Sequence, residues 1–134
     1  MNILLDTHMI LWSLSNSPKL PYAAKQLILN DENEIFFSVI SLWEIEIKRL
    51  VKPDFINTTA EEISHLCIKS GYNLIPLREK AVYHLHSLKR PETEPPHKDP
   101  FDKILLCQAI SENMNFLTHD SLIKGYDSKN IIFV

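Results

Sequence analysis

The sequence predicts an α/β fold in which four to five parallel strands form one sheet with helices on both of its faces. Short apolar runs alternate along the chain with longer segments of helical apolar spacing, a pattern typical of strand–helix–strand units. The chain has only 2 glycines, too few for an all-β protein with many tight turns. Its 134 residues, 45% of them hydrophobic, suit a single domain with one core. We therefore expect residues 1–134 to form one domain.

The first half of the chain is expected to begin with a strand and to continue as alternating helices and strands. The apolar run Asn2–Leu5 predicts a buried parallel strand, because such strands are apolar on both faces. The elements expected after it are a helix over Thr7–Ser15, a helix over Leu20–Leu29, a strand over Glu34–Val39, a helix from Ser41 to about Leu50, and a helix over Thr59–Lys69. Thr59 is a suitable cap for the last of these helices, and Gly71 is a suitable stop signal.

The second half is expected to complete the sheet around one long helix. The elements expected here are a strand over Asn73–Pro76, a helix over Arg78–Leu88, an irregular proline-containing stretch over Lys89–Lys98, a helix from Asp99 to about Asn113, a strand over Asn115–Thr118, a short helix ending near Lys124, and a strand over Ile131–Val134. Asp99 is a suitable cap for the long helix, since Pro100 then occupies the first helical position, where proline is tolerated.

The cysteines and the apolar runs indicate a cytoplasmic protein. Cys67 and Cys107 lie in apolar, helix-like stretches without a Cys-x-x-Cys spacing, so we expect buried free thiols, which suit a reducing compartment. No apolar run approaches the roughly 20 residues that a membrane span needs. The N-terminus has neither the basic region nor the small-residue cleavage site of a signal peptide. We therefore expect no membrane partner.

Four acidic residues lie where this fold would bring them to one edge of the sheet. Asp6 and Asp120 follow predicted strands, whereas Glu44 and Asp102 lie in the first turns of predicted helices. Ligand sites in parallel sheets form outside the carboxyl ends of the strands. Carboxylates gathered there repel one another unless a cation is present, and a set of carboxylate oxygens favours Mg²⁺ or Mn²⁺ over Zn²⁺. The pattern therefore predicts a divalent metal site.

Each acid also has a structural interpretation. Asp6 and Asp120 could cap the helices that follow them. Ser41 and Glu44 have the spacing of a capping box, and Glu44 also lies four residues before Lys48, as in a surface ion pair. Capping alone does not require four acids to share one edge, so the group favours the metal site.

Four stretches, in this order, resemble a known family: Leu4–His8, Ser41–Ile45, His97–Ala109 and Leu117–Asp120. They resemble the Rossmann-like PIN domain, and within it the toxin ribonucleases of type II toxin–antitoxin pairs, the VapC group. The resemblance runs from the first strand to the last and covers nearly the whole chain. It implies a metal-dependent endoribonuclease that holds one or two Mg²⁺ or Mn²⁺ ions and leaves a 5′-phosphate and a 3′-hydroxyl.

The resemblance also assigns roles by position. The implied catalytic and metal-binding residues are Asp6, Glu44, Asp102 and Asp120. Asp99 is a second candidate for the third ligand, because the Asp-x-x-Asp pair leaves that assignment open. Thr7, Ser41 and Thr118 are expected to orient ligands or waters from behind them. Lys103 stands where arginine is more usual, which puts a bidentate contact at that position in doubt.

An RNA substrate requires positive groups near the acidic edge. The candidates are Lys48, Lys98, Lys103 and His119, with Arg49, Lys124 and His97 as further possibilities; each could also be ordinary solvated surface. The formal net charge of −3 becomes +1 when the four proposed metal ligands are left out, so it does not exclude nucleic acid. Trp12 and Trp43 have apolar neighbours, and we expect them in the core rather than stacked on bases.

The resemblance alone implies two protein partners, a cognate antitoxin and a second copy of the chain. Two other functions stay open: a DNA-directed or repair-type nuclease with the same site, and a non-catalytic RNA- or protein-binding module, which would predict a broken quartet. A phosphatase of the aspartyl-phosphate type fits poorly, because Asp6-Thr7-His8 lacks the second aspartate of its Asp-x-Asp nucleophile pair.

Overall fold

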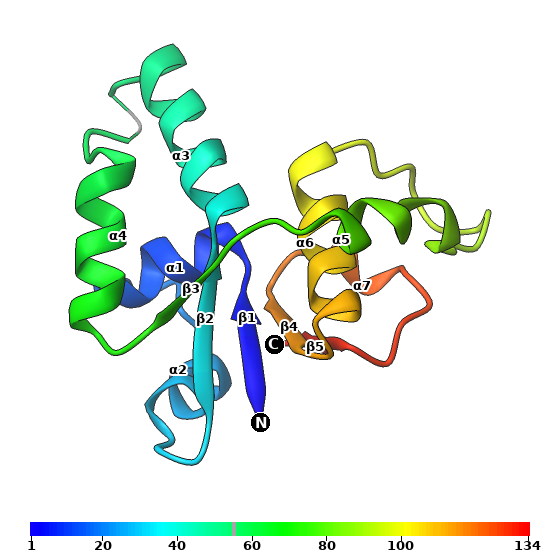
Figure 1. Cartoon of the computed structure of the whole chain (residues 1–134), viewed down its shortest axis with the longest axis horizontal. Coiled ribbons are helices and arrows are strands. Elements are labelled where there is room, and N and C mark those ends of the chain that lie inside the picture. The colour runs from blue at the N-terminus through cyan, green and yellow to red at the C-terminus, as the bar shows by residue number, and fades with distance from the viewer. Residues whose placement is uncertain (55) are drawn as a thin grey trace.

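Five parallel strands form one sheet in the order β3-β2-β1-β4-β5 (Figure 1). The computed structural model describes residues 1–54 and 56–134. The strands are β1 (Asn2–Leu5), β2 (Glu34–Ser38), β3 (Asn73–Ile75), β4 (Asn115–Thr118) and β5 (Ile131–Phe133). The chain builds outward from β1 to β3 on one side and then returns to place β4 against the other side of β1. The strand order therefore reverses between β1 and β4, where open parallel sheets form their binding crevice.

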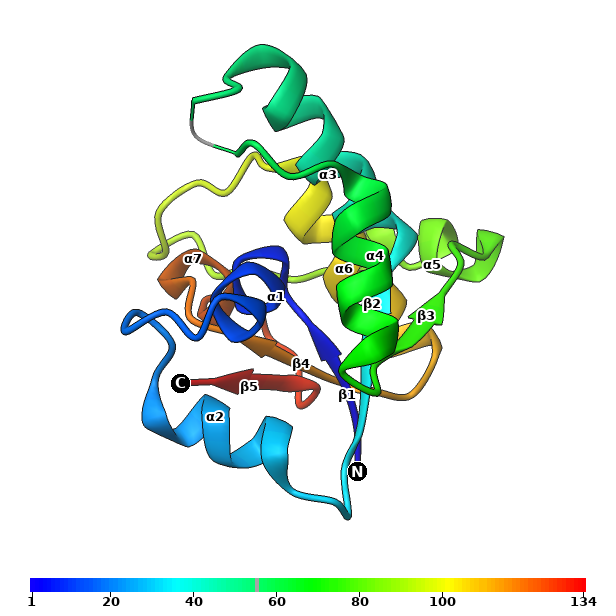
Figure 2. The same cartoon turned by 90° about the vertical axis from the view of Figure 1, so that its left-hand side faces the viewer.

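Helices cover both faces of the sheet, which confirms the predicted fold class. They are α1 (Thr7–Leu14), α2 (Tyr22–Leu29), α3 (Val39–Val51), α4 (Ala60–Lys69), α5 (Glu79–Tyr83), the 3₁₀ turn η1 (Leu85–Ser87), α6 (Pro100–Ser111) and α7 (Ser121–Lys124). Helices α1, α2 and α4 lie on one side of the sheet, and α5, α6 and α7 on the other (Figures 1 and 2). Across the described ranges, no helix is both long and apolar enough to cross a membrane.

The core has two halves because side chains of β1 alternate between the two faces. Ile3 and Leu5 are fully buried with residues of α1, α2 and α4, whereas Leu4 is buried against α6. Cys67 and Cys107 are buried free thiols as predicted, and burial raises their pKa values to about 12 and about 11. Both thiols therefore stay protonated at neutral pH.

Two predicted elements differ in the structure. Helix α3 begins at Val39 rather than Ser41, because Ser38 ends β2 and its Oγ accepts a hydrogen bond from Ile40 N at 3.0 Å. The helix predicted over Arg78–Leu88 is interrupted at His84, which separates α5 from η1. Ser87 donates from both its backbone N–H and its hydroxyl to the His84 carbonyl, which tightens this turn into a 3₁₀ form.

Other local predictions are confirmed, with ends shifted by one or two residues. Thr59 caps α4 by accepting a hydrogen bond from Glu62 N at 3.1 Å, and Gly71 follows that helix with a φ of +88°. The prediction for the tryptophans was wrong at Trp43, whose side chain is 58% exposed on α3. Trp12 is half-buried and packs against the core as expected.

Candidate active site

A cavity of about 340 Å³ opens at the carboxyl ends of β1 and β4, where the strand order reverses. Its lining includes all four acids of the predicted quartet and Asp99: Asp6, Glu44, Asp99, Asp102 and Asp120. Five carboxyl groups therefore come together from four different parts of the chain, because Asp99 and Asp102 both lie at the start of α6. Neighbouring residues hold several of these carboxyl groups in place through hydrogen bonds.

Asp6 follows β1 and caps α1, so its structural interpretation is confirmed. Its Oδ1 accepts a hydrogen bond from Thr7 N at 2.8 Å, and its Oδ2 accepts one from Thr118 Oγ1 at 2.7 Å. Burial raises the pKa of Asp6 to about 7, although these hydrogen bonds oppose the shift; the charges of Glu44 and Asp120 add to it. Asp6 therefore both caps α1 and lines the cavity, where burial destabilises its ionised form.

Glu44 lies in the second turn of α3, so the predicted capping box with Ser41 does not exist. Ser38 caps the helix instead, and Ser41 lies inside it. Thr7 Oγ1 lies 2.7 Å from Glu44 Oε1 and 2.9 Å from Ser41 Oγ. Because a hydroxyl has one proton, Thr7 donates to the carboxylate and Ser41 donates to Thr7. Thr7 therefore restrains Glu44 while also lining the cavity, and Ser41 acts on Glu44 only through Thr7.

The pair of Glu44 with Lys48 is confirmed, but it lies at the cavity rather than on open surface. Lys48 Nζ is 2.6 Å from Glu44 Oε2, and Glu44 itself is buried. Burial alone lowers the pKa of Lys48, but the hydrogen bond and charge of Glu44, followed by the charges of Asp99 and Asp102, outweigh it and raise the pKa. The Lys48 ammonium therefore partly neutralises the acidic cluster.

The start of α6 separates the roles of Asp99 and Asp102. Asp99 caps the helix, since its Oδ1 accepts hydrogen bonds from Phe101 N at 2.9 Å and Asp102 N at 3.3 Å. The side chain of Asp102 takes no part in the cap, and its Oδ2 lies 3.2 Å from His97 Nε2. Burial raises the pKa of Asp102 to about 8, and the charges of Asp6, Asp99, Glu44 and Asp120 raise it further.

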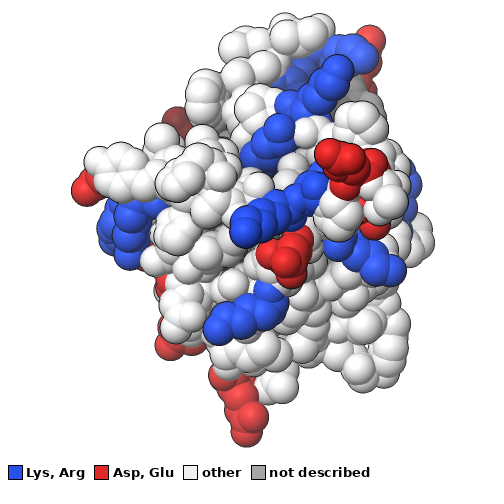
Figure 3. All heavy atoms as spheres, turned by 90° about the vertical axis from the view of Figure 1, so that its right-hand side faces the viewer, with Lys and Arg blue, Asp and Glu red and all other residues white. Residues whose placement is uncertain are grey.

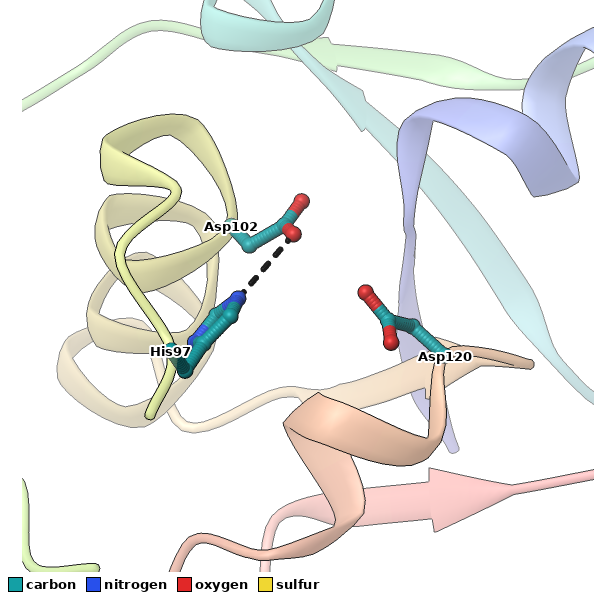
Figure 4. A group of neighbouring side chains, drawn as sticks. All are labelled: His97, Asp102 and Asp120. Atoms are coloured by element: carbon teal, nitrogen blue, oxygen red, sulfur yellow. Dashed lines mark hydrogen bonds and ion pairs between the residues drawn. The ribbon is translucent and has the colours of Figure 1, made fainter. Parts of the chain in front are cut away.

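Asp120 caps α7 through Oδ1, which accepts a hydrogen bond from Leu122 N at 2.9 Å. Its backbone N–H donates to Thr118 Oγ1 at 3.0 Å, and the same hydroxyl donates to Asp6. Thr118 therefore ties Asp6 and Asp120 together. Figure 4 shows Asp120 across from Asp102 and His97, and one ligand atom of each of these three lies within 4.8 Å of the others.

The donor set fits a hard divalent cation. Carboxylate oxygens predominate, as Mg²⁺ and Mn²⁺ require. Burial and mutual repulsion raise the pKa values of Asp6 and Asp102, so the metal-free cluster carries an electrostatic strain that a divalent charge would relieve. The quartet positions could hold such an ion.

The family assignment follows from a comparison with known proteins. The family model of the PIN domain matches residues 3–129, nearly the whole chain. The chain belongs to the PIN domain family. A search of curated proteins finds no match to this PIN domain.

Solved structures share the fold. VapBC2 from Rickettsia felis, bound to a DNA fragment from its promoter, aligns with a TM-score of 0.66 and 20% identity over 100% of this chain and 98% of that chain. VapBC-1 from nontypeable Haemophilus influenzae has a TM-score of 0.56 and 20% identity over 90% and 88% of the two chains. FitAcB from Neisseria gonorrhoeae has a TM-score of 0.56 and 17% identity over 90% and 89%.

Sequence reasoning missed His8 as part of the PIN-domain cavity. Its Nε2 accepts a hydrogen bond from His119 N at 3.2 Å, which leaves the proton on Nδ1, 3.5 Å from Asp6 Oδ2. Burial lowers the pKa of His8 to about 4, so the ring is neutral at pH 7. Its position two residues after Asp6, in the first turn of α1, was the available signal.

Sequence reasoning also treated His97 as a possible surface contact for RNA, and the structure corrects this. His97 is buried between Asp102 and Tyr126, and burial lowers its pKa. Its ring therefore contacts protein groups on both sides rather than solvent.

The basic candidates for RNA binding lie in different settings. Lys48 lines the cavity, Lys98 is exposed, and Lys103 is half-buried near the start of α6. His119 is exposed, but its Nδ1 contacts the Val134 carbonyl. On the face that includes α5, α6 and α7, basic side chains form separate groups with acidic ones between them (Figure 3). The described basic side chains in this view therefore do not form one continuous patch.

Two further candidates are engaged in other contacts. Arg49 pairs with Glu46, one turn before it on α3. The Lys124 ammonium lies 4.9 Å from the centre of the Phe133 ring.

Proposed function

We propose that the protein is a metal-dependent endoribonuclease and the toxin of a type II toxin–antitoxin pair. The observation that carries the proposal is the convergence of Asp6, Glu44, Asp102 and Asp120 on one cavity at the reversal of strand order. Membership of the PIN domain family supports a nuclease, and the likeness to VapBC and FitAcB structures supports the toxin role.

The four carboxylates would hold one or two Mg²⁺ or Mn²⁺ ions. When bound, such ions supply charge stabilisation for the phosphate and lower the pKa of an attacking water. The chain itself holds the metal-binding carboxylates in place before a metal binds: Thr118 orients Asp6, and Thr7 orients Glu44. Metal-binding carboxylates that are already held in place need little reorganisation when negative charge builds up on the phosphate during in-line displacement.

Lys48 is proposed to bind substrate from the wall of the cavity. Its ammonium lies among carboxylates when RNA is absent, and a phosphate oxygen offers an equivalent anionic partner. Lys98, Lys103 and His119 remain proposed contacts for the flanking backbone, because they lie near the helix starts or strand end that form the acidic edge.

The experiment is cleavage of a mixed RNA pool and of DNA strands of matched sequence by the purified protein with Mg²⁺ or Mn²⁺. The proposal expects RNA cleavage that EDTA abolishes, with products bearing 5′-phosphate ends. Cleavage of DNA in preference to RNA would assign the alternative nuclease function. Retention of both nucleic acids without cleavage, by folded protein that binds the metal, would assign a binding module.

A cognate antitoxin and a homodimer, in the cytoplasm, complete the proposal. Helix α3 carries exposed apolar side chains on one face, at Val39, Trp43, Ile47 and Leu50. Their successive spacing of four, four and three residues places them on a single stripe. Contiguous exposed apolar surface of this kind is typical of protein interfaces, which supports a protein partner.

A further inference from the structure

His97 contacts protein groups through both of its ring nitrogens. It lies in the irregular stretch before α6, and its side chain is only 1% exposed. Nδ1 is 2.8 Å from Tyr126 Oη, and Nε2 is 3.2 Å from Asp102 Oδ2. A histidine that ligates a metal needs one nitrogen free to face the ion. The contacts of His97 therefore point to an action on Asp102 rather than on the ion.

The chemistry of the three groups sets the direction of the hydrogen bonds. Asp102 must be ionised to ligate a metal, and an ionised carboxylate only accepts, so in the metal-binding state Nε2 of His97 donates to it. A neutral imidazole then has Nδ1 as its acceptor, and the Tyr126 hydroxyl donates to that nitrogen. The chain of donors runs from Tyr126 through His97 to Asp102.

Tyr126 is itself held by Arg90. The guanidinium carbon of Arg90 lies 5.0 Å from the centre of the Tyr126 ring. Arg90 Nε donates to the Pro95 carbonyl at 2.8 Å, and Nη1 donates to the Leu122 carbonyl of α7. Arg90 thus fastens the stretch that carries His97 to the segment that carries Tyr126.

We propose that His97 is a positioning residue that fixes the Asp102 carboxylate for metal binding, with Tyr126 holding the imidazole in the required orientation. This inference rests on the proposed metal-dependent function. Asp102 does not cap its helix, and its side chain contacts His97 through Oδ2. That contact restrains the carboxylate and leaves Oδ1 for the cavity that Asp102 lines. Groups behind a metal ligand typically change metal affinity or activity by about 10- to 100-fold when removed.

The test is titration of the metal-free protein with Mn²⁺ alone in a calorimeter. His97→Ala is expected to weaken Mn²⁺ binding by about tenfold or more, and Tyr126→Phe to weaken it less. His97→Gln, whose amide can still donate to Asp102, is expected to recover part of the affinity. His86→Ala removes an exposed histidine of η1 and is the matched control, with wild-type affinity expected.

A double variant separates positioning from a general loss of structure. In Asp102→Asn, adding His97→Ala should cost little further affinity, because the group that His97 positions is already changed. Wild-type Mn²⁺ affinity in folded His97→Ala would overturn the inference. If that variant does not fold, wild-type affinity in Tyr126→Phe overturns it instead. A wild-type protein that binds no Mn²⁺ would overturn the proposed function, and this inference with it.

Discussion

Lys48 Nζ lies 2.6 Å from Glu44 Oε2, so the acidic cluster contains an ammonium group from its own chain. The charges of Asp99 and Asp102 also act on this ammonium. A metal ion bound among the acids would compete with Lys48 for Glu44, and a substrate phosphate would give the released ammonium a new partner. Lys48 would therefore connect the proposed binding of the metal with the proposed binding of RNA.

Lys48→Met should raise the KM for RNA by about tenfold, which corresponds to ~1.4 kcal/mol of lost substrate binding. Mn²⁺ affinity should stay the same or rise, because the cluster loses a competing positive charge. Steady-state kinetics on one cleaved RNA and Mn²⁺ calorimetry measure the two effects. Lys52→Met, at an exposed lysine just after α3, is the control. An unchanged KM in Lys48→Met would remove Lys48 from the substrate site.

Thr118→Val should destabilise the fold and slow cleavage together. The buried hydroxyl donates to Asp6 and accepts from Asp120 N, and valine provides neither bond. Loss of a buried hydrogen bond to a charged group costs about 1–3 kcal/mol in the free energy of unfolding. Urea unfolding and RNA cleavage measure the result, with the exposed Thr93→Val as control. Wild-type behaviour in both assays would show that Thr118 does not hold the two acids.

The stability of the metal-free protein should fall as pH rises. Asp6 and Asp102 have pKa values of about 7 and about 8 in the fold, both raised from 3.8. An acid with a raised pKa in the fold stabilises it fully below the unfolded value, and this contribution is lost as pH rises through the folded pKa. The Tm measured by thermal unfolding in EDTA should therefore fall between pH 4 and pH 8 because of these two groups.

Mn²⁺ should counteract this decline, since it binds the ionised carboxylates. The rise in Tm on adding Mn²⁺ should be larger at pH 8 than at pH 5, and Asp102→Asn should reduce the difference. An equal rise at both pH values would contradict a carboxylate site.

Asp99 and Asp102 should behave differently when each is changed to asparagine. Asp102→Asn should abolish Mn²⁺-dependent cleavage with little loss of stability. Asp99→Asn should retain most of the activity, because asparagine also caps helices well. Cleavage rates and melting temperatures of the two variants show which aspartate is the metal ligand. A greater loss of activity in Asp99→Asn would make Asp99, and not Asp102, the ligand.

The position of the acids could be predicted from the sequence because strand ends and helix starts are local features. Asp6 and Asp120 follow short apolar runs, and parallel strands present their carboxyl ends at one edge. The fold class and the strands followed from the same patterns. Membership of the PIN domain family agrees with the order of the motifs.

The remaining features depend on contacts between distant residues. Ser38 and Ser41 are equally suitable caps in sequence, and the contact of Ser41 with Thr7, 34 residues away, decides which one points into the site. His97 contacts Tyr126, 29 residues later, and no periodicity signals that pair. Trp43 has apolar neighbours in the sequence, but it lies on the exposed face of α3, and its side chain is therefore largely exposed to solvent.

The assignment of the acidic cluster as a metal-dependent active site is tested by single-turnover RNA cleavage by Asp6→Asn beside the wild-type protein with Mn²⁺. Asp31→Asn, at an exposed acid in the turn before β2, is the matched control. We expect cleavage by the wild type and the control, and a loss of at least about 100-fold in Asp6→Asn with the fold intact. Full activity in folded Asp6→Asn would contradict the assignment of the acidic cluster as the active site.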